Sequence, residues 1–212
     1  MQACRPRIEG VPPGSLSSEQ RPAIFLDRDG VINVDHGYVS TPEATTWVPG
    51  IFDLCRLGQE LGYVLLVVTN QAGIGRGLYT EAQFKSYTRW MLGEFTARGI
   101  SVSAVYYCPH HADAGVGDYR TICRCRKPAP GMLLAAKEDY GLDLRRSVMI
   151  GDNVSDMQAG LAAGVGTCVR LLHDSCSLQA GVGFRQVMDL SEVAGHVRAA
   201  AASASCASSR GG

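Results

Sequence analysis

The chain has 212 residues, of which 46% are hydrophobic and 19% are charged, and its formal net charge is zero. This length allows one ordinary hydrophobic core, and the zero net charge argues against nucleic-acid binding through a broad basic surface. No apolar stretch is long enough to span a bilayer, and no signal-peptide core precedes Ala23. We therefore expect a cytoplasmic protein that acts on a small anionic molecule and does not bind a membrane.

The first predicted strand covers Ala23–Leu26 and ends on two acids, Asp27 and Asp29, separated by one residue. Side chains two apart on an extended backbone point to the same side, so both acids can converge on one ligand while Arg28 points away. Two carboxylates this close need a cation or a shared proton, which suggests metal-assisted chemistry. The alternative is a simple polar turn after a strand. The preceding stretch, Met1–Pro22, lacks periodicity and is expected to be a flexible tail.

Further strands and helices alternate along the chain. Strands are predicted at Tyr63–Val68, Val102–Tyr107, Val148–Ile150 and Thr167–Leu171, and helices at Ile51–Leu61, Glu81–Arg98, Gly131–Tyr140 and Ser155–Ala163. The alternation predicts an α/β fold, in which a mostly parallel sheet forms the middle layer of a Rossmann-like three-layer sandwich. We place this single domain at residues 23–198, without a large cap domain, and expect a flexible tail at 199–212.

Polar side chains follow two more of these strands and a cysteine-rich loop. They are Thr69, Asn70 and Gln71, then Arg126 and Lys127, and finally Asp152 and Asn153. Ligands of parallel α/β sheets bind beyond the carboxyl ends of the strands, so these groups should meet the two acids in one crevice. Each could instead serve only to end a strand or to cap a helix, as Asp152 could for the helix carrying Asp156.

The segments DRDG, TNQ, RKP and GDN-x-x-D, in this order, resemble the four motifs of haloacid dehalogenase (HAD) superfamily phosphatases. The resemblance covers roughly Ala23 to Leu172. It agrees with the chemistry of the residue types. Asp27 would attack phosphorus to give an aspartyl-phosphate, and Asp29 would serve as general acid and then as general base. Lys127 and the Thr69 hydroxyl would stabilise the phosphoryl oxygens.

The same site should bind a magnesium ion. Oxygen ligands from Asp27, from Asp152 and from a backbone carbonyl near Asp29 suit the octahedral coordination that Mg²⁺ prefers. Asp156, one helical turn beyond Asp152, would orient loop groups or the metal shell.

A second metal site is indicated by Cys108-Pro109-His110 and, twelve residues later, Cys123-Arg124-Cys125. Three sulfurs and one imidazole match a closed, structural zinc site, although His111 could replace His110 as the ligand. Ordinary buried thiols or disulfides are the alternatives, and a reducing cytosol disfavours disulfides. The remaining cysteines show no pairing pattern; they are Cys4, Cys55, Cys168, Cys176 and Cys206.

With this zinc loop and the segment DHGY, the sequence is closely similar to D-glycero-D-manno-heptose 1,7-bisphosphate 7-phosphatases. Their relatives include histidinol-phosphate phosphatases with a comparable loop. The implied substrate-binding residues are Asp35, His36, Gly37, Tyr38, Asn70, Gln71, Arg126 and Asn153. Arg126 would recognise the second phosphate, and Asn153 departs from the lysine expected at its position.

The resemblance implies a monomeric, Mg²⁺-dependent enzyme that removes the 7-phosphate and feeds nucleotide-activated heptose synthesis for lipopolysaccharide. Histidinol phosphate is the alternative substrate. A catalytically inactive, zinc-bearing interaction module is a further alternative, but it should lack one of Asp27, Asp29, Lys127 or Asp152, and all four are present.

Overall fold

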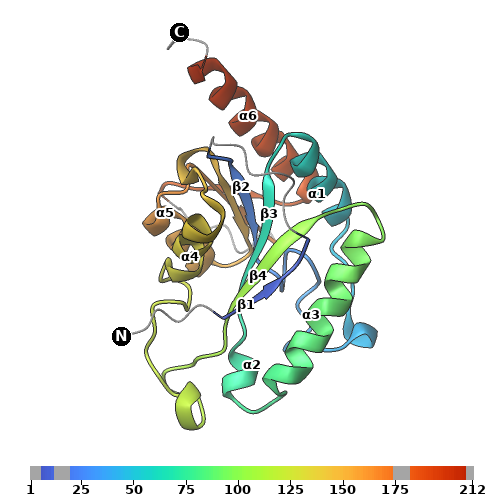
Figure 1. The fold of residues 1–212 in the computed structure, drawn as a ribbon, viewed down its shortest axis with the longest axis vertical. Coiled ribbons are helices and arrows are strands. Elements are labelled where there is room, and N and C mark those ends of the chain that lie inside the picture. The colour runs from blue at the N-terminus through green and yellow to red at the C-terminus, as the bar shows by residue number, and fades with distance from the viewer. Residues whose placement is uncertain (1–5, 12–19, 174–181, 209–212) are drawn as a thin grey trace.

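Figure 1 shows the computed structural model of the chain, which describes residues 6–11, 20–173 and 182–208. Its centre is a seven-stranded sheet with the order β1-β4-β3-β2-β5-β6-β7. Strand β1 runs antiparallel to β4, and every other neighbouring pair is parallel. This confirms the predicted α/β fold with a mostly parallel sheet.

The strands are β1 (Arg7–Glu9), β2 (Ala23–Leu26), β3 (Val64–Asn70), β4 (Val102–Cys108), β5 (Val148–Gly151), β6 (Thr167–Leu171) and β7 (Arg185–Val187). The α-helices are α1 (Ile51–Glu60), α2 (Ala72–Gly75), α3 (Glu81–Thr96), α4 (Gly131–Tyr140), α5 (Val154–Ala163) and α6 (Leu190–Ser208). Short 3-10 helices are η1 (Pro42–Ala44), η2 (Gly117–Tyr119) and η3 (Leu144–Arg146).

The two faces of the sheet are covered by different helices. Alternate residues of the central strands are buried on opposite faces, as Ile24 and Leu26 pack into one cluster and Phe25 into the other. Helices α1, α3 and α6 cover the first face, and α4 and α5 cover the second. Because both faces are covered, the central strands are apolar along their length, as the buried strand β2 illustrates.

The ends of the domain differ from the sequence-based boundaries at residues 22 and 199. Strand β1 lies within the expected N-terminal tail, and α6 continues through the start of the expected C-terminal tail to Ser208. In Figure 1, α6 extends past the sheet at the end opposite α2. Cys4 and Cys176 lie outside the described residues.

Two connections in the structure bear on the site. Between β2 and β3 the chain forms only η1 and α1, and between β3 and β4 only α2 and α3, so neither described connection contains a cap domain. Helix α3 begins with a capping box, in which the Thr80 hydroxyl accepts from the Gln83 amide at 3.1 Å. Because neither connection contains a cap domain, the carboxyl ends of β2, β3 and β5 open on short loops.

Within the described ranges, no helix combines the length and apolar character needed to cross a membrane.

Candidate active site

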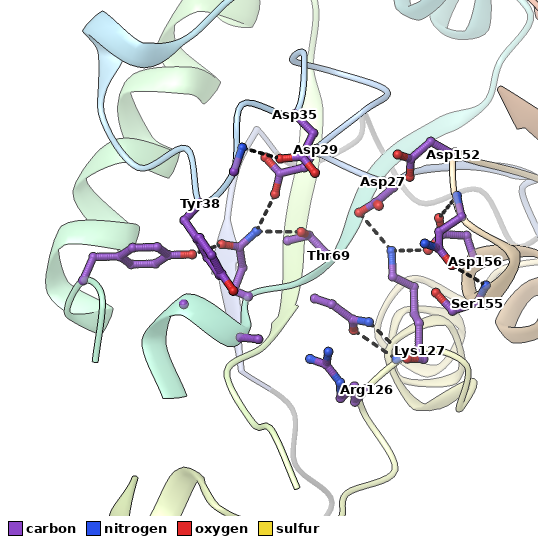
Figure 2. Close-up of a pocket in the computed structure, with 17 residues that line it drawn as sticks. Asp27, Asp29, Asp35, Tyr38, Thr69, Arg126, Lys127, Asp152, Ser155 and Asp156 are labelled. Atoms are coloured by element: carbon purple, nitrogen blue, oxygen red, sulfur yellow. Dashed lines mark hydrogen bonds and ion pairs between the residues drawn. The ribbon is translucent and has the colours of Figure 1, made fainter. Parts of the chain in front are cut away.

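A cavity of about 620 Å³ lies beyond the carboxyl ends of β2, β3 and β5 (Figure 2). It brings together the polar segments that follow these strands. Its lining comprises Asp27, Asp29, Asp35, Gly37, Tyr38, Thr69, Asn70, Gln71, Ala72, Gly73, Tyr79, Arg126, Lys127, Asp152, Asn153, Ser155 and Asp156. Of the residues that the sequence assigned to catalysis, magnesium or substrate, only His36 is not part of this lining.

At the centre of the cavity Lys127 joins two acids. Its Nζ lies 2.9 Å from Asp27 Oδ1 and 2.7 Å from Asp156 Oδ1, and it donates to Val68 O at 2.7 Å. These three acceptors match the three hydrogens of an ammonium group. The Asp27 amide donates to Ile150 O at 2.9 Å and thereby fixes the backbone of Asp27 to β5. The nucleophile and cation expected from the sequence are thus in direct contact.

Burial and charge perturb the pKa values of this group. Burial raises the pKa of Asp27, against the effect of the Lys127 ammonium, and it raises the pKa of Asp152 to about 6 with a contribution from Asp156. Burial lowers the pKa of Lys127, but the carboxylates of Asp156 and Asp27 outweigh that effect and raise it. Three acids around one ammonium lack compensating positive charge, and a divalent cation would supply it.

The arrangement of oxygens fits such a cation. Asp27, Asp152 and Asp156 each place a carboxylate oxygen within 4.8 Å of the others. Asp156 already accepts from Lys127 and, at 3.0 Å, from the Asn153 amide, so Asp27 and Asp152 have the oxygens available to a metal. The Asp29 carboxylate faces Arg28 instead, and a metal contact through its backbone carbonyl stays a prediction.

A chain of hydrogen bonds sets the orientation of the Thr69 hydroxyl. Tyr79 donates to Gln71 Oε1 at 2.6 Å, which turns the Gln71 amide nitrogen toward Thr69 Oγ1 at 2.8 Å and Asp29 Oδ2 at 3.2 Å. Because the Thr69 oxygen accepts from Gln71, its own hydrogen is left for a substrate oxygen. Gln71 therefore contacts two of the expected catalytic residues.

Asn70 and Arg126 hold the loop that carries Lys127. The Asn70 side chain accepts from the Lys127 amide and donates to the Lys127 carbonyl, both at 3.0 Å. Arg126 Nη1 donates to His110 O at 3.1 Å, while Arg126 also lines the cavity. The position of Lys127 thus depends on the end of β3 and on the loop containing His110.

The loop after β2 forms another wall of the cavity. Asp35 Oδ1 accepts from the Gly37 amide at 2.9 Å, and the Tyr38 hydroxyl accepts from Arg76 Nη1 at 2.7 Å. His36 Nε2 lies 3.0 Å from Thr46 Oγ1. The structure therefore brings Asp35, Gly37 and Tyr38 to the cavity and leaves His36 beside Thr46.

Asn153 lies at the opposite wall, where it caps α5. Its side chain accepts from the Ser155 amide at 3.1 Å, and the carboxylate of Asp156 accepts from the Asn153 amide. The N-cap of α5 is Asn153 and not Asp152, so the alternative role considered for Asp152 is wrong.

The four expected zinc ligands lie together beside the cavity. Cys125 Sγ lies 3.3 Å from Cys123 Sγ and 3.4 Å from Cys108 Sγ, and His110 Nδ1 lies 3.5 Å from Cys108 Sγ and 3.4 Å from Cys125 Sγ. Ligands of a tetrahedral zinc with bonds of about 2.3 Å lie roughly 3.8 Å apart, so these residues fit the ion, whereas a disulfide needs sulfurs about 2.05 Å apart. His111 instead accepts backbone amides through Nδ1, so the described cluster uses His110.

The sequence analysis did not identify every residue of the site. It missed Ala72, Gly73, Tyr79 and Ser155, which line the cavity, and Arg28 and Asn33, which donate to the carboxylate of Asp29. Arg28 was expected to point away from the acids, but its side chain is fully buried and pairs with Asp29. The alternation of a strand does not apply there, because β2 ends at Leu26 and the chain turns.

Comparisons with known proteins agree with this arrangement. Residues 124–171 match the model of the HAD-hydrolase-like family. A curated D-glycero-beta-D-manno-heptose-1,7-bisphosphate 7-phosphatase from Yersinia pestis is 50% identical over 148 residues, 70% of this chain and 79% of its own. A curated D-glycero-alpha-D-manno-heptose-1,7-bisphosphate 7-phosphatase from Burkholderia mallei is 52% identical over 155 residues, which are 73% of this chain and 82% of its own.

Solved structures of phosphatases are also similar to this chain. The D,D-heptose 1,7-bisphosphate phosphatase of B. bronchiseptica, complexed with magnesium and phosphate, has a TM-score of 0.72 and 30% identity, covering 83% of this chain and 97% of its own. A HAD-like phosphatase from Mesorhizobium loti has a TM-score of 0.80 and 35% identity, covering 92% of each chain.

Fold and site together define a HAD-type phosphoric monoester hydrolase. Within that class, the identity to curated enzymes over more than two thirds of the chain is decisive. The chain belongs to the D-glycero-D-manno-heptose 1,7-bisphosphate 7-phosphatase family.

Proposed function

We propose that this chain hydrolyses the 7-phosphate of D-glycero-D-manno-heptose 1,7-bisphosphate, giving heptose 1-phosphate and inorganic phosphate. The observation that carries the proposal is the contact of Asp27 with Lys127 beside Asp152, in a chain 50% identical to curated enzymes named for this reaction. The intact acids and lysine also argue against a catalytically inactive module.

In the proposed first step, a carboxylate oxygen of Asp27 attacks phosphorus, and the bond from phosphorus to the sugar oxygen breaks. Asp29 gives its proton to that oxygen, so the sugar leaves as an alcohol and Asp27 carries the phosphoryl group. Lys127 and the Arg28 amide both donate to Oδ1 of Asp27, which leaves Oδ2 as the attacking atom.

In the second step, water attacks the phosphorus of the aspartyl-phosphate while the Asp29 carboxylate takes a proton from the water. The Asp27 carboxylate leaves, phosphate is released, and Asp29 is protonated for the next cycle. Throughout both steps the Thr69 hydroxyl and the Lys127 ammonium, which belong to almost fully buried residues, would stabilise phosphoryl oxygens.

Two metal ions belong to this proposal. Asp27 and Asp152 would hold Mg²⁺, which when bound neutralises phosphoryl charge and aligns the phosphate with Asp27. Cys108, His110, Cys123 and Cys125 would hold Zn²⁺ in a structural role, because all four tetrahedral positions are then occupied by protein.

The substrate side of the cavity would recognise the rest of the sugar. Asp35, Gly37 and Tyr38 offer oxygen and backbone groups on one wall, and Arg126 offers the cation for the 1-phosphate. Asn70, Gln71 and Asn153 complete the proposed substrate-binding set; His36 would need to leave Thr46 to join it.

Phosphate release from a substrate panel tests the function. The panel contains the alpha and beta anomers of the bisphosphate and histidinol phosphate, and phosphorus NMR identifies which phosphate is lost. We expect a higher kcat/KM for a bisphosphate than for histidinol phosphate, with loss of the 7-phosphate alone. Preference for histidinol phosphate would refute the heptose assignment, and absence of turnover of every panel member with Mg²⁺ would refute the activity.

One relative is named for the beta anomer of the bisphosphate and another for the alpha anomer. The substrate panel contains both anomers, so it also measures which of them this chain prefers. A monomeric state, a cytoplasmic location and supply of heptose 1-phosphate to nucleotide activation for lipopolysaccharide complete the proposal.

A further inference from the structure

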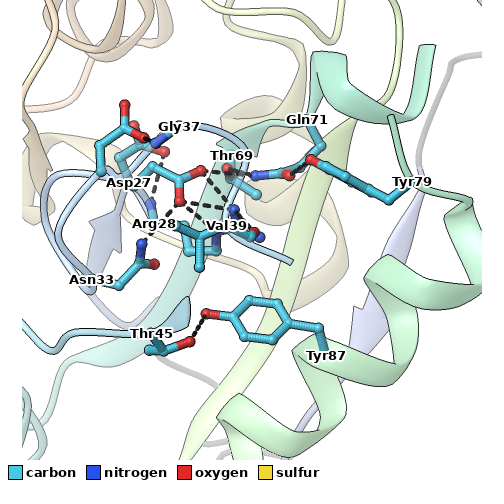
Figure 3. A network of polar contacts seen from close by, with 12 residues as sticks. Asp27, Arg28, Asn33, Gly37, Val39, Thr45, Thr69, Gln71, Tyr79 and Tyr87 are labelled. Carbon is cyan, nitrogen blue, oxygen red and sulfur yellow. Dashed lines mark hydrogen bonds and ion pairs between the residues drawn. The ribbon is translucent and has the colours of Figure 1, made fainter. Parts of the chain in front are cut away.

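Arg28 is a buried cation that the reaction proposed above does not use. Its side chain is 1% exposed, although the residue follows Asp27 directly. Figure 3 shows that it lies among Asn33, Val39 and Tyr87. A charge at such depth needs specific partners, and their arrangement indicates what the residue does.

The principal partner is the carboxylate of Asp29. Arg28 Nη2 lies 2.8 Å from both Oδ1 and Oδ2, and Nε lies 3.1 Å from Oδ1. The fork of the guanidinium thus grips both oxygens and fixes the plane of the carboxylate. Asn33 Nδ2 adds a third donor to Oδ1 at 3.0 Å, and Gln71 adds a second donor to Oδ2 at 3.2 Å.

The guanidinium is itself held in place. Nη2 also donates to Val39 O at 2.7 Å, and the ring centroids of Tyr87 and Phe84 lie 5.2 and 5.8 Å from the guanidinium carbon. Nη1 is buried and has no hydrogen-bond partner among the described residues. The Val39 carbonyl and the two aromatic rings therefore fix the orientation of the guanidinium that holds Asp29.

We propose that Arg28 is a positioning residue that fixes Asp29 so that Oδ2 carries the proton exchanged in catalysis. Three N–H donors contact Oδ1, whereas Oδ2 accepts from Arg28 and, at the longer distance of 3.2 Å, from Gln71, so the bond from Gln71 is the one that a proton on Oδ2 would displace. The side chain of Asp29 is 22% exposed at the cavity. In step one the Oδ2–H bond breaks as the sugar oxygen gains the proton. In step two Oδ2 regains a proton from the attacking water. The inference rests on the proposed function only for its aspartyl-phosphate chemistry.

Arg28→Lys and Arg28→Met test this role, because neither side chain can grip a carboxylate through two parallel donors. Tyr87→Phe is the matched control: it removes the bond to Thr45 in the same pocket and retains the ring next to Arg28. Beryllium fluoride mimics the phosphoryl group of an aspartyl-phosphate, so titration with beryllium fluoride and Mg²⁺ counts the protein molecules whose Asp27 site is intact. We expect kcat per site with the bisphosphate to fall about 10- to 100-fold in both Arg28 variants, with KM changed less than about threefold, and no such fall in the control.

An activated ester separates positioning from a general structural defect. The leaving group of p-nitrophenyl phosphate needs no proton, so the first turnover should stay fast in Arg28→Met and only the second step, which needs the base, should be slow. We expect a burst of about one p-nitrophenolate per counted site followed by slow release. Unchanged kcat per site, or a slow first turnover with this ester, would overturn the proposal.

Two controls distinguish a failure of the proposed role of Arg28 from a failure of the heptose assignment and from a failure of the variants to fold. If wild-type enzyme shows the ester reaction but does not act on the bisphosphate, the heptose assignment fails while the role of Arg28 is still decided. If neither Arg28 variant folds, Asn33→Ala decides, since it removes a donor to the same Oδ1 and leaves Arg28 in place. A smaller fall in kcat per site with the same burst supports the proposal, and unchanged kinetics overturn it.

Discussion

At the scale of single residues, the site depends on two close approaches. One is the approach of Asp152 to the turn after Asp27, which only a residue without a side chain permits. Gly30 has a φ of +83°, and a Cβ atom there would lie 2.1 Å from Asp152 Oδ2. The other is the contact of Lys127 with two carboxylates in a fully buried position. Each approach makes a separate prediction.

Gly30→Ala should displace Asp152 and so weaken metal-dependent turnover. Gly62→Ala is a matched control, because Gly62 has a φ of +82° and nothing within 4 Å of its Cβ position. Both variants should lose about 1 kcal/mol of stability from the backbone conformation. Only Gly30→Ala should also need more Mg²⁺ for half-maximal activity, measured by titration. Equal metal requirements in the two variants would contradict this prediction.

Lys127→Met should be strongly destabilising as well as inactive. Removing the ammonium leaves Asp27 and Asp156 as neighbouring buried acids, and breaking a buried pair on one side costs about 3–5 kcal/mol. Urea denaturation would measure the change in free energy of unfolding. Lys137→Met, at an exposed position of α4, should change it by less than about 0.5 kcal/mol. A similar small loss in both variants would show that Lys127 is not required to compensate these acids.

At the scale of elements, the zinc loop between β4 and α4 explains how the cation reaches the nucleophile. The loop begins at Cys108, the last residue of β4, and Cys125 precedes Arg126 and Lys127. Arg126 donates to the carbonyl of His110, so the ligand residues and the cations belong to one connected unit. An irregular loop of this kind has little core of its own, and a metal can replace that core.

Cys123→Ser should therefore lower zinc content, stability and phosphate turnover together. A serine hydroxyl is a poor zinc ligand, and a loosened loop would misplace Lys127. Metal analysis, thermal unfolding and a turnover assay on the same sample measure the three effects. Cys55→Ser makes the same exchange at a buried cysteine of α1 and should leave zinc content unchanged. Full activity in a zinc-free Cys123→Ser protein would refute the positioning role.

At the scale of the whole molecule, the sequence predicted the central architecture because long apolar runs bury both faces of parallel strands. Strands β2 and β6 and helix α4 have the predicted bounds. The edge strands β1 and β7 were missed because each has three residues with a single buried position, Ile8 in one and Val187 in the other. Pairing with a neighbour, and not a local pattern, creates such strands.

The candidate site shows the same limit. Asp27, Lys127 and Asp152 could be predicted because motifs at strand ends converge in any parallel α/β sheet. Arg28, Asn33 and Tyr79 could not, because their contacts with the site depend on turns that bring a side chain back toward its neighbours. The positions of such supporting residues follow from packing that periodicity does not describe.

Glu81 connects three parts of the molecule and gives a pH-dependent prediction. Its carboxylate accepts from Tyr107 of β4 at 2.6 Å and from Tyr119 of η2 at 3.0 Å, and it pairs with Lys85 at 2.7 Å. The bond from Lys85, followed by the bond from Tyr107, lowers the pKa of Glu81 below its ordinary value of 4.5. A carboxyl group whose pKa is lower in the folded state stabilises the fold above the unfolded pKa, and that stabilisation is lost as the pH falls through the folded pKa.

The stability difference between wild type and Glu81→Gln should accordingly be larger at pH 7 than at pH 4, and should continue to shrink below pH 4. Urea denaturation at a series of pH values measures this difference. Glu94→Gln is the matched control, because in the described part of the chain the Glu94 carboxylate pairs with Arg98 alone, at the exposed C-terminal end of α3. An exposed pair within one helix contributes little, so its pH dependence should be small. A difference for Glu81→Gln that stays constant between pH 7 and pH 4 would show that its charge does not hold α3, β4 and the zinc loop together.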